Sequence, residues 1–242
     1  MINSVRNTVL AIINKNNYGY ISPSDFNLFA KQAQLDLFDE YFYSYNQQIN
    51  KENSRISGTG YADLKKGIEE VIDTFSVTQS LSQNANNIFF LPSASTTGSD
   101  YYLLNKVLCS TGGVYKGEAE KVGQSKITLL NSSILTAPSI TYPAYSQEAS
   151  SITIYPSTYN TFGDVQAQYI RYPEDPKWTF TSISNGDPIF DQSQPDFQDF
   201  ELPIDDGNDL VAKILQYAGI SIREGDVVKF GQMEEQIQNQ QQ

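Results

Sequence analysis

Hydrophobic residues recur at spacings of three and four over the first part of the chain, which is the spacing of an amphipathic helix. A first short helix is predicted to run to about Asn14, with Asn3 or Ser4 as its cap. A further helix is predicted from about Asp63 to Asp73. The apolar positions of these two helices are Val5, Val9, Ile12, Ile13, Leu64, Ile68, Val71 and Ile72.

Between these two helices the same spacing continues long enough to predict one long helix. Ser22 is placed as its N-cap, Pro23 occupies the first helical position, and Asp25 supplies the acidic partner of a capping box. The pattern continues to about Asn50, which gives a helix of about 40 Å. Its apolar positions are Phe26, Phe29, Ala30, Ala33, Leu37, Tyr41, Tyr45 and Ile49.

The second half of the long helix carries aromatic residues on more than one face. Phe38, Phe42 and Tyr43 lie outside the main apolar stripe. Two interpretations follow from this: the helix is buried on one side within its own domain, or its second face is reserved for a neighbouring subunit. Phe42 and Tyr43 are therefore candidate interface residues.

After about Thr74 the hydrophobic spacing shortens to nearly two, which is typical of strands. Short segments rich in β-branched and aromatic residues follow one another, separated by Gly, Pro, Asn and Ser. They predict roughly eight or nine strands that end near Pro203 and form a sandwich or a rolled sheet. The segments are FSVTQSL, NIFFLP, YYLLNKVLC, GEAEKV, KITLL, SITYPAY, SITIYPS, DVQAQYIRY and KWTFTSI.

Helical spacing returns near the end of the chain, in ELPIDDGNDLVAKILQYAGISI. The apolar face of this helix contains Leu210, Ile214 and Leu215, and Gly219 is a candidate stop. The predicted fold class is α+β, in which N- and C-terminal helices form a helical platform with a central antiparallel all-β region. The predicted parts are 1–75, 76–202 and 203–242, and the last is expected to pack with the first.

Composition excludes several classes of function. The chain carries 16 basic and 28 acidic residues, a net charge of −12, so it is not expected to bind nucleic acid specifically or to bind an anionic membrane. It lacks histidine and has one cysteine, Cys109, which excludes histidine-based catalysis, an internal disulfide and most zinc sites. The apolar run near the start is too short for a membrane span. No cofactor, metal site or enzymatic activity is predicted.

Other binding and catalytic functions remain weaker alternatives. Eight acidic residues lie between Asp187 and Asp209, but the spacing of a calcium loop is absent, so a solvated acidic loop is favoured over an ion site. Acidic pairs such as Asp205 and Asp206 could serve a glycosidase, although adjacent residues do not face each other on a helix. The many tyrosines could form a glycan-stacking surface.

The stretch RYPEDPKW contains the chain's one tryptophan immediately after a predicted strand. Pro173 removes a ladder donor and disfavours helix at Tyr172, so it ends the strand, and Pro176 keeps the following residues extended. Trp178 either fills the core of its own domain or forms a corner with Tyr172 that docks on a neighbouring subunit.

Two runs, DVQAQYIRYPEDPKWTF and DFELPIDDGNDLVAKILQYAGISI, together with NKNNYGYISPSDFNLFAKQAQLDLFDEYF, resemble structural proteins of podovirus-type tailed bacteriophages, most of all the crAss-like phages. The resemblance touches most of the chain. It implies a virion protein that forms a ring or head-to-tail adaptor at the portal vertex, assembled in the bacterial cytoplasm. In such adaptors a C-terminal arm reaches toward the portal, and residues 217–242 match it by position.

The resemblance therefore implies partners instead of a substrate. The expected partners are about twelve copies of the chain itself in one ring, the portal protein, other tail or ring proteins, and genomic DNA passing through the lumen without specific binding. The alternative function is a fibre-docking or glycan-binding tail module. The candidate interface residues are Phe42, Tyr43, Tyr172, Trp178, Phe230, Met233 and Ile237.

Overall fold

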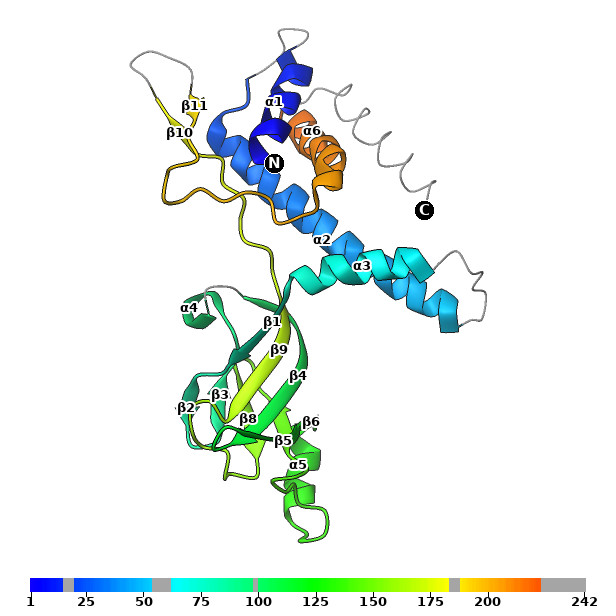
Figure 1. The fold of residues 1–242 in the computed structure, drawn as a ribbon, viewed down its shortest axis with the longest axis vertical. Coiled ribbons are helices and arrows are strands. Elements are labelled where there is room, and N and C mark those ends of the chain that lie inside the picture. The colour runs from blue at the N-terminus through cyan, green and yellow to red at the C-terminus, as the bar shows by residue number, and fades with distance from the viewer. Residues whose placement is uncertain (15–19, 54–61, 98–99, 183–187, 223–242) are drawn as a thin grey trace. The chain divides into compact units, whose positions relative to one another are not determined.

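The computed structural model describes residues 1–14, 20–53, 62–97, 100–182 and 188–222. It divides the chain into two compact units, which we call the helical unit (residues 1–71 and 173–242) and the β unit (residues 72–172). Figure 1 shows helices from both ends of the chain and antiparallel sheets formed by its middle part. The predicted α+β class is confirmed.

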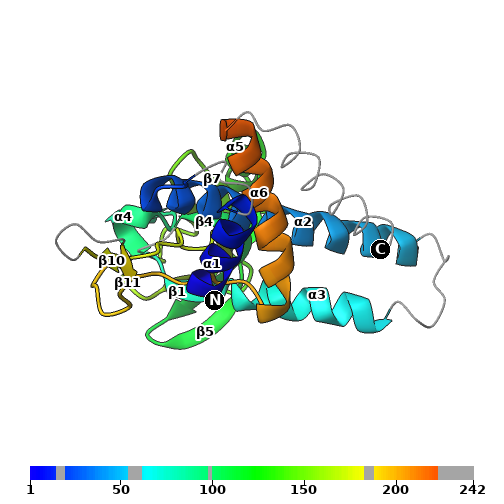
Figure 2. The same ribbon diagram turned by 90° about the horizontal axis from the view of Figure 1, so that it is seen from above.

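The helical unit contains elements from both ends of the sequence. Its elements are α1 (Ile2–Ile13), α2 (Pro23–Asn53), most of α3 (Ala62–Thr74), β10 (Phe180–Thr181), β11 (Ile189–Phe190), the short 3-10 helix η2 (Ile204–Asp206) and α6 (Gly207–Ile222). Helix α6 packs against both α1 and α2, as Figures 1 and 2 show. Its apolar stripe is buried at Leu210, Ile214, Leu215 and Ala218.

The long helix α2 begins as predicted. The backbone N–H of Asp25 donates to the Ser22 hydroxyl oxygen at 3.1 Å, and that hydroxyl donates to the Asp25 carboxylate at 2.6 Å. This reciprocal arrangement satisfies a donor that the first helical turn leaves unpaired. The helix has 31 residues, which corresponds to about 46 Å.

Helix α1 has Met1 as its N-cap, two or three residues before the caps predicted from sequence, Asn3 and Ser4. No side chain of its own N-cap position caps it. Instead the carboxylate of Asp199 accepts hydrogen bonds from the amino group of Met1 at 2.6 Å and from the backbone N–H of Ile2 at 2.7 Å. A carboxylate at this end also complements the helix dipole. A residue 197 positions away along the chain therefore supplies the cap.

The β unit is a sandwich of two sheets. In its described residues one sheet has the order β1-β9-β4-β5 and the other β2-β3-β8-β7-β6, and all pairs are antiparallel except β6 with β7. The strands are β1 (Ser76–Ser80), β2 (Gln83–Ala85), β3 (Ile88–Phe90), β4 (Tyr101–Thr111), β5 (Val114–Glu118), β6 (Glu120–Lys121), β7 (Ala144–Gln147), β8 (Ser151–Tyr155) and β9 (Val165–Arg171); the unit also has short helices α4 (Ala94–Thr97) and α5 (Gln124–Asn131).

Both sheets contribute to one hydrophobic core, and in several of their strands alternate residues point inward. In β8, for example, Ile152 and Ile154 are buried and their neighbours are partly exposed. The core consists of Leu81, Phe89, Leu91, Val107, Cys109, Ala119, Tyr145, Ile152, Ile154, Tyr159, Val165, Ala167 and Tyr169.

Three sequence-based expectations are corrected by the structure. The segment KITLL is part of helix α5, so its β-branched residues did not decide its conformation. Gly219 does not end α6, which continues to Ile222. The segment 173–202 belongs to the helical unit and not to the β region. Within its described residues, the only named strands are the two-residue β10 and β11.

Segment 173–202 lies on α2 because side chains of that helix bind its backbone. Asn27 accepts from the backbone N–H of Trp178 at 2.8 Å and donates to its carbonyl at 3.2 Å. Gln34 donates to the carbonyl of Glu174 at 2.8 Å and accepts from the N–H of Glu201 at 3.1 Å. Asn27 and Gln34 are seven residues apart, so they share one face of the helix. The two side-chain amides thus form the backbone hydrogen bonds that a neighbouring strand would form in a sheet.

Replacing Gln34 by alanine is expected to lower the free energy of unfolding by about 2 to 3 kcal/mol, because two backbone groups lose their partners. Gln34 is 1% exposed, so water cannot easily replace the amide. The matched control is Gln32→Ala on the exposed side of the same helix, which loses one weak contact with Asp36 at 3.3 Å. Thermal melts should show a fall of about 5 to 10 °C for Gln34→Ala. Equal melting temperatures for the two variants would contradict the prediction.

Candidate interaction surfaces

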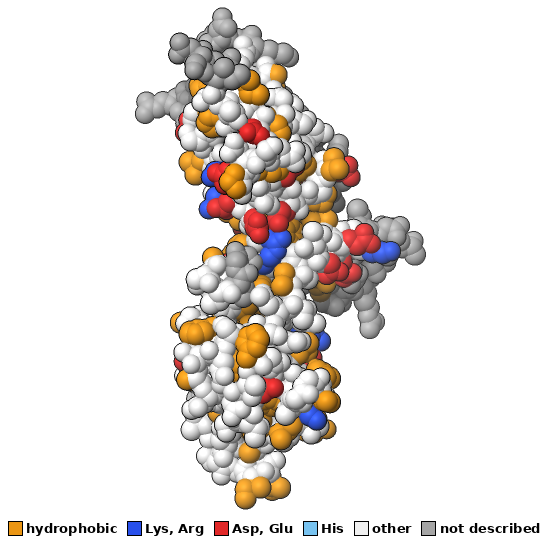
Figure 3. Space-filling model, turned by 60° about the vertical axis from the view of Figure 1, so that its left-hand side comes forward, with side chains coloured by type: hydrophobic (Ala, Val, Ile, Leu, Met, Phe, Trp, Pro, Cys, Tyr) orange, Lys and Arg blue, Asp and Glu red, His pale blue; other side chains and the backbone are white. Residues whose placement is uncertain are grey.

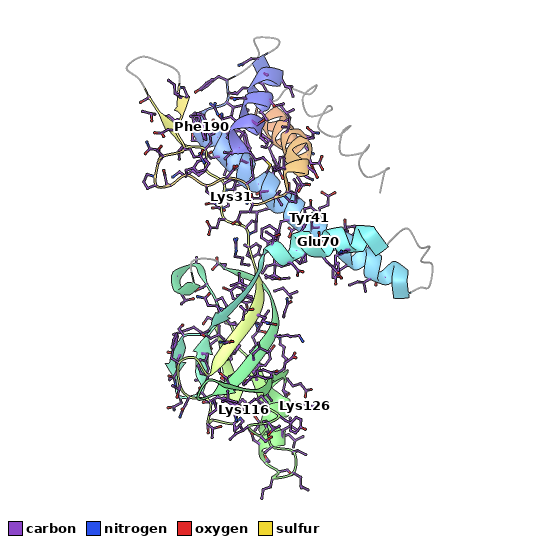
Figure 4. The ribbon with its side chains drawn as sticks, in the orientation of Figure 1. Lys31, Tyr41, Glu70, Lys116, Lys126 and Phe190 are labelled. Carbon is purple, nitrogen blue, oxygen red and sulfur yellow. The ribbon has the colours of Figure 1, made fainter. Side chains whose placement is uncertain are left out.

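Trp178 is the centre of an aromatic cluster in the helical unit. Its ring stacks with Phe180 at 5.7 Å and Phe190 at 5.9 Å between centroids, and Phe190 meets Phe197 edge to face. We call these four residues the aromatic corner. The indole N–H of Trp178 donates to the side-chain oxygen of Asn3 at 3.1 Å. Figure 4 labels Phe190 on β11. Trp178 is only 2% exposed, so it fills the core of its own unit and cannot itself contact a neighbour.

Arg6 packs on this cluster and has no acidic partner among the described residues. Its guanidinium carbon lies 3.8 Å from the centre of the Trp178 ring, and the residue is 5% exposed. The Nε atom is enclosed and has no hydrogen-bond partner. Burial lowers the pKa of Arg6, and its interaction with Tyr20 opposes this shift only in part. A desolvated cation–π contact contributes about 2 kcal/mol, whereas burying an ion costs several kcal/mol, so the ring offsets only part of the cost.

The residues proposed as an interface from sequence belong to both units and to the end of the chain outside the described residues. On α2, Tyr43 is exposed, and Phe42 is half-buried in an edge-to-face contact with Phe38 at 4.9 Å. Tyr172 belongs to the β unit, where it is 39% exposed and meets Tyr102 edge to face at 5.2 Å. Phe230, Met233 and Ile237 lie outside the described residues.

A more exposed apolar surface lies at one end of the β unit. Leu129 on α5 and Ile134 and Leu135 in the following loop are exposed to 72%, 99% and 96%. We call these three residues the aliphatic tip. Figure 3 shows hydrophobic side chains at this end, and Figure 1 shows α5 and its loop extending away from the two sheets. Nearly complete exposure of two adjacent aliphatic side chains is unfavourable in water, which indicates a contact surface.

The loop that carries the tip is held in a defined conformation. The N–H of Ala137 donates to the carbonyl of Ser133 at 2.9 Å, and the Thr136 hydroxyl donates to the carbonyl of Leu130 at 3.1 Å. At the base of the loop, the buried Tyr159 hydroxyl donates to the carbonyl of Ile140 at 2.6 Å. The tip is therefore presented by an ordered loop anchored in the core of the β unit.

The charge around the tip differs from that of the chain. Between Val122 and Gln147 the one charged residue is Lys126, although the whole chain has a net charge of −12. Figure 4 shows Lys126 and Lys116 at the same end of the β unit. Sequence reasoning missed this surface because KITLL was interpreted as a strand, and the uncharged run SSILTAPSIT after it was the available signal.

Cys109, the cavity of the β unit and the acidic residues were compared with the requirements of catalytic and metal sites. Burial raises the pKa of Cys109 to about 12, and Asp164 adds to the shift, so the thiolate is not available at neutral pH. A cavity of about 640 Å³ in the β unit has Asp100 as its one charged lining residue, and this carboxylate accepts from the N–H of Ala94. No group of three potential metal ligands converges within the described ranges.

Carboxylates of the acidic stretch and of α2 form contacts between helices instead. The Tyr41 hydroxyl donates to Asp206 at 2.6 Å, and Lys213 pairs with Glu40 at 3.3 Å, both between α2 and the region of α6. Burial raises the pKa of Asp206, the hydrogen bond from Tyr41 opposes this, and the charges of Asp209, Asp205 and Glu40 raise it further.

Neutralising Asp206 is expected to stabilise the protein at pH 7. Because the folded state raises this pKa, the folded state binds the proton more tightly, so the wild-type protein gains stability as pH falls through the folded pKa. Asp206→Asn keeps an acceptor for Tyr41 and removes the charge, which should add no more than about 1 kcal/mol at pH 7. The gain should vanish below the pKa of the unfolded chain. Melts of Asp206→Asn, with the exposed Asp205→Asn as control, measure this, and a gain that persists in acid would contradict it.

Comparison with known proteins adds no assignment. No protein-family model matches the chain, and a search of curated proteins found no match. Within the ranges that the structure describes, none of the helices is both long enough and apolar enough to cross a membrane.

Proposed function

We propose that this chain is a structural virion protein of a podovirus-type bacteriophage that forms a ring of about twelve copies at the portal vertex. The ring connects the portal to the tail and lines the DNA channel. It assembles in the cytoplasm of the host from this chain, the portal protein and other tail or ring proteins. The sequence resemblance described above motivates this proposal.

The observation that carries the proposal is that each unit exposes large apolar side chains of its own. The β unit presents the aliphatic tip. The helical unit exposes a different set of large apolar side chains, namely Tyr20, Leu28, Tyr43, Phe180, Ile189 and Ile204. A ring is built from heterologous contacts, in which two different patches of each subunit meet. The aliphatic tip and the exposed apolar side chains of the helical unit are two unlike sets of residues that such contacts could use.

The net charge of the chain supports its proposed role in lining the DNA channel. With 28 acidic against 16 basic residues, a lumen lined by this protein would repel the phosphates of DNA. DNA could then slide without being held, since protein–DNA affinity depends on basic side chains that neutralise phosphates.

The test is quantitative mass spectrometry of purified particles of the phage that encodes the chain, with copies counted against the major capsid protein. About twelve copies per particle are expected, as one symmetric ring requires. Electron microscopy of the purified chain, alone and with the portal protein, should show rings of the same copy number.

Other results would exclude the ring. A copy number several times higher would indicate a fibre or decoration protein, and retention of the purified chain on a glycan array would then favour the glycan-binding module. Absence from the particle would exclude any structural role in the virion.

A further inference from the structure

We infer that Arg6 is the core of a binding site for a carboxylate group that none of the described residues of the chain supplies. Arg6 lies on the buried stripe of α1 together with Ile2, Val5, Val9 and Ile13. It is the stripe's one charged member and the one buried arginine of the described residues. Buried charges in folded proteins are normally paired, so the unpaired guanidinium indicates an anionic partner.

Four acidic residues of segment 173–202 already have other partners. Asp199 binds the amino group of Met1, Asp196 pairs with Lys177 at 2.5 Å, and Asp175 pairs with Lys31 at 2.7 Å. Asp191 accepts hydrogen bonds from the Thr181 hydroxyl, the Gln194 amide and the N–H of Ser193. No described carboxylate of this chain lies within ion-pair distance of Arg6.

The chemistry of the site favours a carboxylate over other ligands. A guanidinium presents its N–H donors in a planar fork that matches two carboxylate oxygens. The guanidinium carbon lies over the Trp178 ring at 3.8 Å from its centre, and Asn3 fixes the indole by accepting from its N–H. The carboxylate can be a small molecule in solution or an acidic side chain of a second copy. The chain has 12 more acidic than basic residues, so unpaired carboxylates are available on another copy.

The experiment uses Trp178 as a reporter, because it is the chain's one tryptophan and contacts Arg6 directly. The full chain is titrated with acetate and then with succinate, against chloride at the same ionic strength, while tryptophan emission is recorded. The variants are Arg6→Met, which keeps an apolar stem, and Arg6→Lys, which keeps the charge without the fork. Lys177→Met is the matched control, since Lys177 adjoins Trp178 but pairs with Asp196.

A saturable change in emission is expected for the wild type and for Lys177→Met. It should be absent in Arg6→Met and at least tenfold weaker in affinity in Arg6→Lys. This result identifies a carboxylate in solution as the ligand. If acetate and succinate have no effect, emission should instead depend on protein concentration, and Arg6→Met should abolish that dependence, which identifies a second copy as the source.

The inference is overturned if wild type and Arg6→Met respond equally in both series. A melting temperature of Arg6→Met well below that of the wild type, in chloride and at low protein concentration, would likewise show that Arg6 acts only by packing on Trp178. The inference is independent of the ring proposal. If Arg6→Met forms normal rings, the ring proposal still stands, and only a second copy is excluded as the source of the carboxylate.

Discussion

Replacing Trp178 by alanine is expected to lower the free energy of unfolding by about 4 kcal/mol, the largest stability loss that we predict for a single substitution. The side chain is among the largest of the fully buried ones and contacts Phe180, Phe190 and Arg6. Removing the indole leaves a cavity that these neighbours can fill only in part. Arg6 also loses its one described ring contact.

The measurement is urea unfolding followed by far-UV circular dichroism, because the variant has no tryptophan to report by fluorescence. The melting temperature should fall by about 10 °C or more. Tyr20→Ala is the control: this exposed aromatic residue should change stability by less than about 0.5 kcal/mol. A loss below about 1 kcal/mol for Trp178→Ala would show that the aromatic corner is not a packed core.

Replacing Ile134 and Leu135 together by serine is expected to weaken assembly more than a hundredfold while leaving the isolated chain as stable as before. Burial of one large aliphatic side chain contributes about 1.5 to 3 kcal/mol, so the pair contributes about 3 to 6 kcal/mol if both are buried in a contact. Each 1.4 kcal/mol is about a tenfold change in the dissociation constant. The monomer loses nothing, because both side chains are already in water.

Mass photometry over a range of concentrations, with and without the portal protein, measures this effect. Phe162→Ser is the matched control, since Phe162 is also an exposed apolar residue of a β-unit loop but lies outside the aliphatic tip. Assembly should be unchanged in the control. If the double variant assembles as the wild type does, or if its melting temperature falls, the tip is not a contact surface.

Local sequence rules predicted the parts of the fold that local interactions determine. The start of α2 was predicted because Ser22 and Asp25 lie three residues apart and bind each other directly. The β unit was predicted for a similar reason, since strands such as β8 alternate buried and exposed residues along their length.

The rest depends on contacts between residues far apart in the sequence. The cap of α1 is Asp199, which no local pattern near Ile2 could indicate. The segment after Pro173 contains β-branched and aromatic residues, which favoured a strand in the prediction. Its backbone instead binds Gln34 on α2, so the segment belongs to the helical unit. The aliphatic tip was missed because an exposed Ile134 has the same sequence signature as a buried one.

The division of the helical unit between the two ends of the chain sets an order for folding during synthesis. The β unit is one continuous segment, 72–172, and can fold as soon as it leaves the ribosome. Helix α1 leaves first but must wait for Asp199, made 197 residues after Ile2, which takes about 10 to 40 s at usual rates of synthesis. During that interval the buried stripe of α1 is without its partners on α6, so the nascent chain exposes it to chaperones.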